Sequence, residues 1–212
     1  LSYLVGAVVT IINVAAGLPM AILIARNRLG RAVSTMLDVA TNIPLIIPSI
    51  ALGVSLSLFW KENLAFIPEI WLLIFAHLSI TYPYFVRAMA AAIERINVDL
   101  EDAARILGAR PFTVFRTIIL PLTKYSLFAG AIMVFTRSVD ETGATLAVLS
   151  TESPLRTAPV LLARDWIKPF LQNPASAPVN SLEIALGCGF LIILSFITLL
   201  ALRFIVGRRG RY

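Results

Sequence analysis

Charged residues are scarce in this chain of 212 amino acids. They make up 14% of it, against 58% hydrophobic residues, whereas soluble proteins average about 25% charged residues. The mean hydropathy is +0.87. A soluble domain of this length would still need a charged surface to cover its core. The composition therefore argues against an ordinary soluble domain and predicts a membrane protein.

Cysteine and histidine are almost absent, with Cys188 and His77 as the single examples. One cysteine excludes an internal disulfide and a cysteine-based metal cluster, and one histidine excludes a centre built on a histidine pair. We therefore expect no metal site. We expect Cys188 to fill a small buried space and His77 to hydrogen-bond a neighbouring helix. The chain also lacks an initial methionine, so we expect it to be incomplete at its N-terminus.

Long apolar segments make up much of the chain. Five of them come near the ~20 residues that cross a bilayer. They are Leu1–Ala25, a span within Ser34–Trp60, about Ile70–Ile93, Leu122 to about Val139, and Leu182–Val206. They predict an all-α, polytopic membrane helix bundle that forms one domain over residues 1–212. Pro44, Pro48 and Pro83 should kink their spans, and such kinks can form gates.

Arginine-rich loops alternate with loops that are poorer in arginine. The loop Arg26–Arg31, the loop after the third span and the C-terminal tail are rich in arginine, whereas Lys61–Glu69 and residues 140–181 are not. Arginine-rich loops stay in the cytoplasm, so we expect a cytoplasmic C-terminus. A bundle with both ends inside needs one further span before Leu1, six in all. The net charge of +6 thus reflects membrane orientation, and no patch indicates nucleic-acid binding.

The outer loop, residues 150–181, is rich in proline and too long for a simple turn. Its middle, Ala158–Ile167, favours a short helix, with Trp166 as an anchor at the membrane surface. A loop of this length can be functional, or it can simply cover the bundle.

Residues 97–121 form a polar interruption on the cytoplasmic face. The stretch "LEDAARIL" favours a helix with Asp99 as its N-cap. Gly108 should end that helix, Pro111 suits the first turn of another, and Pro121 should mark the return to the membrane. We predict a helix–turn–helix elbow parallel to the bilayer, either an ordinary interfacial loop or a docking surface presenting Ala103 and Ala104.

The spacing within this elbow resembles a cytoplasmic signature of the permease subunits of binding-protein-dependent ABC importers. That signature is Glu-Ala-Ala, three residues, Gly, nine residues and Ile-x-Leu-Pro. The chain has Asp102-Ala103-Ala104, three residues, Gly108, nine residues and Ile118-Ile119-Leu120-Pro121. Its departure is Asp102 in place of Glu, with Glu101 beside it.

The resemblance implies that the elbow is a coupling helix, which sits in a groove of a separate ATPase subunit. The residues implied in coupling are Glu101, Asp102, Ala103, Ala104, Gly108, Pro111, Ile118, Leu120 and Pro121. The chain has no G-x-x-x-x-G-K-[ST] loop for phosphates. The resemblance thus implies a non-catalytic subunit without a cofactor, with ATP and Mg on the ATPase. It also implies a prokaryotic inner membrane, a second permease copy or paralogue, and an extracytoplasmic substrate-binding protein.

A second polar cluster lies between Phe135 and Ser150. Arg137 and Glu141 are four residues apart on one helical face, at a depth where charges pair or face an aqueous path. They form either an internal ion pair or, with Thr142, Gly143 and Thr145, the outer part of a translocation path. We add Pro48 to this candidate path because a kink there can form a gate.

Two short resemblances imply that the substrate is an inorganic oxyanion, with several alternatives beside it. The stretch "DETGATLAV" is similar to a Glu-x-Gly-Ala segment of permeases for molybdate, tungstate and sulfate, and "TAPVLL" resembles their outer loop. Against an oxyanion, Asp140 and Glu141 would repel it unless neutralised. Permeases for iron(III), thiamine or polyamines share the elbow signature. An ion-coupled secondary transporter using Arg137, Asp140 and Glu141 is a further alternative, while no nucleophile–base pair favours an intramembrane enzyme.

Overall fold

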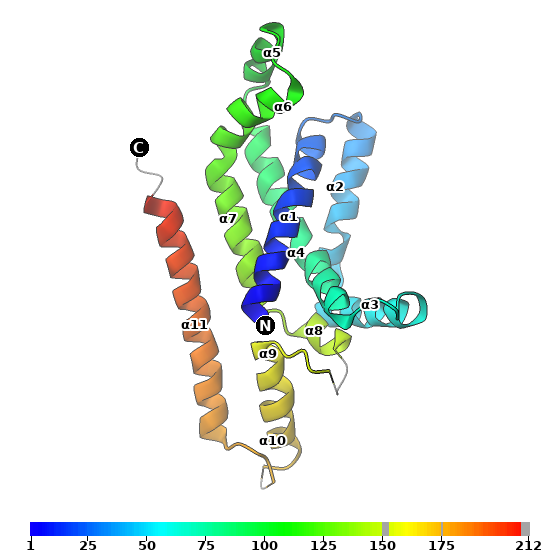
Figure 1. The fold of residues 1–212 in the computed structure, drawn as a ribbon, viewed down its shortest axis with the longest axis vertical. Coiled ribbons are helices and arrows are strands. Elements are labelled where there is room, and N and C mark those ends of the chain that lie inside the picture. Colours follow the sequence, from blue (N-terminus) through cyan, green and yellow to red (C-terminus); the bar gives the residue numbers. More distant parts are fainter. Residues whose placement is uncertain (150–152, 175, 209–212) are drawn as a thin grey trace.

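The computed structural model describes residues 1–149, 153–174 and 176–208, and the regular secondary structure of these residues is entirely helical. Three continuous helical stretches long and apolar enough to cross a membrane are α1 (Ser2–Ala25), α4 (Glu69–Glu94) and Pro111–Val139. The fourth is Ser181–Leu200 within α11 (Ser181–Arg208). The predicted all-α membrane bundle is therefore confirmed (Figure 1).

The expected second span is a broken one. Helices α2 (Arg31–Ile46) and α3 (Ser49–Asn63) meet at an angle of 103°. Pro48 caps α3, and Ile47 before it is extended (φ −86°, ψ 130°). Proline disfavours helical geometry in the residue before it and donates no backbone N–H, so the helix ends there. The predicted kink at Pro48 is confirmed, and it divides the expected second span into two helices.

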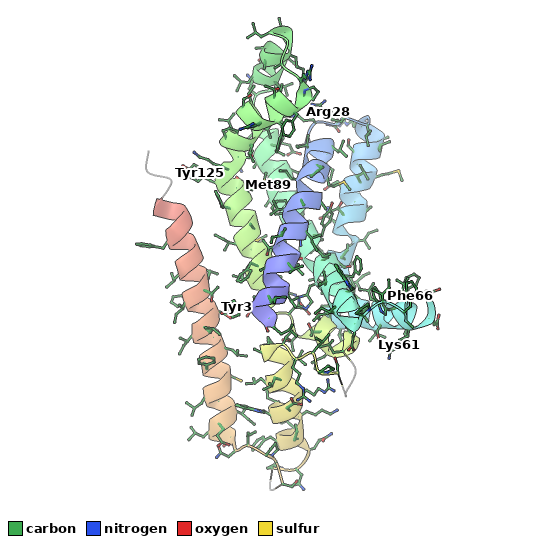
Figure 2. All side chains as sticks on the ribbon, in the orientation of Figure 1. Tyr3, Arg28, Lys61, Phe66, Met89 and Tyr125 are labelled. Atoms are coloured by element: carbon green, nitrogen blue, oxygen red, sulfur yellow. The ribbon has the colours of Figure 1, made fainter. Side chains whose placement is uncertain are left out.

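Helix α4 is the centre of the bundle and packs against α1, α2 and α7. Its side chains Leu73, Phe85, Met89 and Ile93 are fully buried, and Figure 2 shows Met89 within the bundle. The Phe85 ring lies so close to Gly17 of α1 that a Cβ there would come within 2.6 Å of it. The absence of a side chain at Gly17 thus lets α1 and α4 approach closely.

The outer loop contains the short helix that the sequence predicted. Helix α9 (Ala158–Leu161), the π-helix η2 (Leu162–Ile167) and α10 (Lys168–Gln172) follow one another without a break. They lie at the end of the molecule opposite α5 (Val98–Ile106) and α6 (Pro111–Val114) (Figure 1). Trp166 packs against α11, since a Cβ on Gly187 would lie 2.8 Å from its ring.

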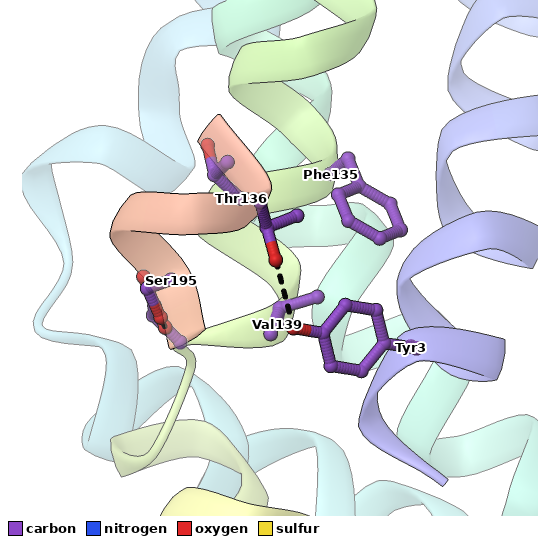
Figure 3. A pocket seen from close by; sticks show the side chains of 7 residues that line it. Tyr3, Phe135, Thr136, Val139 and Ser195 are labelled. Carbon is purple, nitrogen blue, oxygen red and sulfur yellow. Dashed lines mark hydrogen bonds between the residues drawn. The ribbon is translucent and has the colours of Figure 1, made fainter. Parts of the chain in front are cut away.

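Helix α11 stands at the edge of the bundle (Figure 1). Side-chain hydrogen bonds connect it to the rest: Tyr3 with Thr198 at 2.9 Å, drawn in Figure 3, and the Ser195 hydroxyl to Asp140 at 2.8 Å. Because α11 is peripheral, Cys188 is only half-buried. The expectation that Cys188 fills a buried space was wrong.

Candidate functional site

The elbow begins at Asn97 rather than at Asp99. The Asn97 side-chain oxygen accepts a hydrogen bond from the Asp99 backbone N–H at 3.0 Å, and Asn97 is itself extended. These are the features of an N-cap residue. The prediction of Asp99 as the cap was therefore wrong by two residues. Asp99 lies in the first turn of α5, where its negative charge suits the helix dipole.

Gly108 ends α5 as predicted. Its φ of +84° lies in the left-handed region that side chains disfavour. The Gly108 N–H donates to the Arg105 carbonyl at 2.9 Å, and the Ala109 N–H donates to the Ala104 carbonyl at 3.0 Å. This pair of hydrogen bonds is a Schellman motif, which fixes the direction in which the chain leaves the helix.

The second arm of the elbow is continuous with a membrane span. Helix α6 starts at Pro111, as the sequence predicted, and passes through the π-helix η1 (Phe115–Ile119) into α7 (Leu120–Val139). Pro121 lies in the first turn of α7. Pro121 does not interrupt this helix, because the wider π turn before it relieves the clash of a proline ring with an α-helical turn. That Pro121 marks the return to the membrane stays a prediction. The elbow and α7 can therefore move together.

Glu101 anchors the elbow to α1. Its carboxylate is 1% exposed, and its Oε1 accepts a hydrogen bond from Arg26 Nε at 2.8 Å. Its Oε2 lies 3.1 Å from an Arg105 nitrogen and 3.9 Å from one of Arg28. Arg26 also donates to the Ile96 carbonyl at 3.1 Å. Beside this anchor is a cleft of about 320 Å³, lined by Ala25, Arg26, Asn27, Arg28, Val98, Glu101 and Arg105.

The outer surface of the elbow is apolar and exposed. Ile106 and Leu107 are each 87% exposed and Phe112 is 71% exposed. Asp102 lies on the same outer side of the anchor, with 55% of its side chain exposed and a 2.8 Å ion pair to Arg105. We call Asp102, Ala103, Ile106, Leu107 and Phe112, which are all exposed, the elbow surface.

The structure divides the predicted coupling residues into three groups. Asp102 and Ala103 are exposed and Ala104 is half-buried on α5, whereas Glu101 is buried behind them. Gly108 and Pro111 shape the turn. Ile118 and Leu120 are half-buried, and Pro121 is exposed, on the helix that leads away from the elbow.

Sequence reasoning missed Arg26 and Arg28 as partners of this site. The run of arginines from Arg26 to Arg31 was visible but was interpreted only as a marker of orientation. Glu101 is 75 residues from Arg26 in sequence, and no local pattern joins positions so far apart. An acid in the elbow and a basic loop after the first span were the available signals.

The second candidate cluster surrounds the turn between α7 and α8 (Gly143–Val148). Arg137 lies 2.8 Å from Glu141 Oε2, an ion pair whose alignment is poor for a hydrogen bond. The other oxygen of Glu141 accepts the Ala144 backbone N–H at 3.0 Å, near the start of α8. The predicted Arg137–Glu141 pair is confirmed, and Glu141 additionally caps α8.

The broken span and the cluster lie against each other. A Cβ on Gly143 would be 2.6 Å from the Ser49 hydroxyl, next to Pro48, and one on Gly53 would be 2.7 Å from the Ala144 carbonyl. The structure therefore brings Pro48 close to the segment from Glu141 to Thr145. Within that segment, Thr142 and Gly143 are half-buried, whereas Glu141 and Thr145 are buried.

His77 of α4 completes the cluster. It is 1% exposed, and its two ring nitrogens lie 2.8 Å from the Ser138 hydroxyl and 2.9 Å from the Thr145 hydroxyl. The predicted hydrogen bond to a neighbouring helix is confirmed, with one bond on each side of the α7–α8 turn.

Comparison with known proteins identifies the family to which this apolar bundle belongs. Residues 17–212 match the family described as binding-protein-dependent transport system inner membrane component. The chain belongs to this family. It is thus a multi-pass membrane permease of a transport system, and the family resemblance inferred from the elbow signature is confirmed.

Individual relatives extend over most of this permease. The molybdenum transport system permease protein of Haemophilus influenzae is 31% identical over 202 residues, which cover 86% of this chain and 82% of the relative. The molybdate/tungstate transport system permease protein of Thermococcus kodakarensis is 29% identical, with 92% and 72% covered. The sulfate transport system permease protein of Salmonella typhimurium is 29% identical, with 95% and 74% covered.

Proposed function

We propose that this permease forms the membrane path of an ATP-driven importer for an inorganic oxyanion, namely molybdate, tungstate or sulfate. The observation that carries the proposal is the elbow: an exposed apolar surface on a helix whose base is fixed by a buried ion pair. Exposed apolar patches of this kind mark protein interaction sites. The names of the three relatives support the oxyanion class.

The elbow surface is the site at which we propose that an ATPase subunit docks. Asp102 supplies a charge, and Ala103 lets the partner approach closely. The ATPase binds ATP and Mg, while this chain contributes no catalytic group and no cofactor. Because α6 continues into α7, closure of two ATPases would displace α7 as a rigid body.

The arrangement of the ends supports the proposed topology. The Arg26–Arg31 turn lies at the elbow end, where Figure 2 labels Arg28, and the helices α9 and α10 lie at the other. We place the elbow end, with the C-terminus, in the cytoplasm of a prokaryotic cell. The substrate-binding protein would then dock on the opposite end. A second permease, a copy or a paralogue, would complete the path, and residues 1–212 would form one permease domain.

The two carboxylates near the proposed path each have a polar partner. Glu141 is paired with Arg137 and with the Ala144 N–H, and Asp140 accepts a hydrogen bond from Ser195. Pairing with Arg137 offsets the negative charge of Glu141, which weakens the objection that these acids would repel an oxyanion. We propose that the path passes Pro48, Arg137, Glu141, Thr142, Gly143 and Thr145 where α3 meets α8.

Reconstitution tests this proposal directly. The permease, its ATPase and its binding protein are incorporated in liposomes with ATP on the ATPase side, and uptake of labelled molybdate, tungstate and sulfate is measured. We expect uptake that requires ATP and the ATPase. Calorimetry of the binding protein with these anions, iron(III), thiamine and spermidine identifies the substrate. Selective binding of one of the last three would refute the oxyanion, and ion-driven uptake by the permease alone would refute ATP coupling.

Gly53→Val is expected to block uptake while the ATPase still binds. The new side chain would meet the Ala144 carbonyl, 2.7 Å from the position of Cβ, and such overpacking costs about 1–3 kcal/mol. It would therefore push α3 away from α8. Gly189→Ala is the control, because a Cβ there has nothing within 4 Å. Normal uptake by the Gly53 variant would show that close packing of α3 on α8 is dispensable.

A further inference from the structure

His77 connects three helices through two opposite ring nitrogens. It lies on α4, whereas its partners Ser138 and Thr145 lie before and after the α7–α8 turn. The three side chains are at most 2% exposed. A buried side chain that uses both its polar atoms on separate elements holds those elements at a fixed distance and angle. We call this arrangement the His77 bridge.

The hydroxyl partners accommodate a neutral His77 ring. When the Thr145 hydroxyl donates to the Glu141 carbonyl at 3.1 Å, it accepts from His77 Nε2–H at 2.9 Å. The ring then offers Nδ1 as an acceptor to the Ser138 hydroxyl at 2.8 Å. A neutral imidazole with its hydrogen on Nε2 satisfies both partners. An aliphatic side chain can make neither of these hydrogen bonds.

The bridge is itself held from α1. The Thr81 hydroxyl donates to the His77 backbone carbonyl at 2.7 Å and accepts from the Asn13 amide at 3.0 Å. The Asn13 amide also donates to the Val9 carbonyl at 2.9 Å. The polar network therefore runs from α1 through α4 to the α7–α8 turn, in a part of the bundle that is otherwise apolar.

Both helices joined by the bridge lead to the elbow. His77 lies about 26 Å along α4 from its end at Glu94, and Ser138 lies about 40 Å along the helix from Pro111, at 1.5 Å per residue. On the other side of the bridge, Glu141 caps α8, and α8 packs on α3 through Gly53. The bridge is thus a polar connection between two sets of helices. On one side are α4 and α7, which lead to the elbow, and on the other is α8, which packs on α3 of the broken span.

We propose that His77 is a positioning residue for transport, which makes the α7–α8 turn move with α4 and α7 and so transmits displacement of the elbow to α8 and α3. This inference rests on the proposed function, because it takes the elbow as the place where ATP-driven movement enters. His77 touches no substrate in this role. It acts through the turn whose Arg137–Glu141 pair lies in the proposed path.

The test measures oxyanion molecules imported per ATP hydrolysed by the complete reconstituted complex. Ser138→Ala and Thr145→Val each remove one partner of the ring and leave a buried nitrogen unsatisfied. We expect each to lower the ratio about tenfold, with ATP hydrolysis retained. Thr123→Val is the matched control, because this buried hydroxyl bonds only within its own helix, to the Ile119 carbonyl at 2.7 Å, and should leave the ratio unchanged.

A triple variant separates positioning from simple stability. His77→Leu combined with Ser138→Ala and Thr145→Val removes all the polar side-chain atoms of the bridge, so that only the Glu141 carbonyl loses a donor. Such apolar replacement can be nearly neutral for stability. We expect its melting temperature to stay near that of the starting complex while the transport ratio stays low. A ratio restored to the starting value would overturn the proposal, as would unchanged ratios in both single variants.

A variant of the elbow distinguishes failure of the His77 proposal from failure of the proposed coupling function. If Gly108→Val lowers ATP-driven uptake and the bridge variants leave the ratio unchanged, the inference about His77 alone fails. If Gly108→Val imports normally, the proposed coupling function fails, and the bridge then has no elbow movement to transmit.

Discussion

Gly108→Val is expected to reduce ATP-driven uptake about 5- to 30-fold. Gly108 adopts a φ of +84°, and left-handed backbone costs other residues about 1–2 kcal/mol, with a β-branched side chain among the worst cases. That cost shifts the population of the ordered turn by the stated factor. The elbow surface would then be displaced from its orientation toward the ATPase. The measurement is uptake by proteoliposomes together with ATPase co-purification.

Two further substitutions at Gly108 separate the effect of backbone strain from the effect on contact with the ATPase. A Cβ at Gly108 meets nothing within 4 Å, so no side chain clashes inside the chain itself. Asparagine tolerates left-handed backbone, and Gly108→Asn should therefore retain most of the uptake. Gly108→Asp has a similar backbone tolerance but places a charge beside the elbow surface, and we expect it to abolish uptake by weakening docking. Equal uptake by all three variants would contradict a role for this turn in coupling.

Glu101→Ala is expected to release the elbow from α1. The substitution leaves the Arg26 guanidinium, 8% exposed, without its carboxylate partner. Breaking a buried ion pair in this way costs about 3–5 kcal/mol. The melting temperature of the complex should fall, and trypsin should cleave the elbow after Arg105, which is exposed. ATP-driven uptake should be lost with the ordered elbow.

Asp102→Asn is the matched control for this loss. Asp102 also pairs with Arg105, but 55% and 38% of the two side chains are exposed, and such surface pairs contribute about 0–1 kcal/mol. We expect unchanged melting and trypsin resistance, with weaker binding of the ATPase. If the Glu101→Ala complex had the same melting temperature and trypsin resistance as the Asp102→Asn complex, the buried anchor would have no structural role.

The sequence did not indicate which of the two adjacent acids, Glu101 or Asp102, is buried. Counting along the signature assigned the acidic position to Asp102 and treated Glu101 as its neighbour. Adjacent residues on a helix point about 100° apart, so one acid can be buried while the next is exposed. Which one is buried depended on the Arg26 side chain at the end of α1, far away in sequence.

The sequence by itself determined the membrane class, the helical spans, the position of the elbow and the family. These follow from local properties, because apolar length, proline and glycine positions and motif spacing act within one segment of chain. The tertiary structure alone decided that the second span bends by 103°, that Glu101 is the anchor and that His77 joins α4 to both sides of the α7–α8 turn. The break itself is local to Pro48, but the angle reflects the close approach of α3 to α8 at Gly53. The anchor and the bridge depend on side chains 61 to 75 residues apart, so packing rather than local pattern sets them.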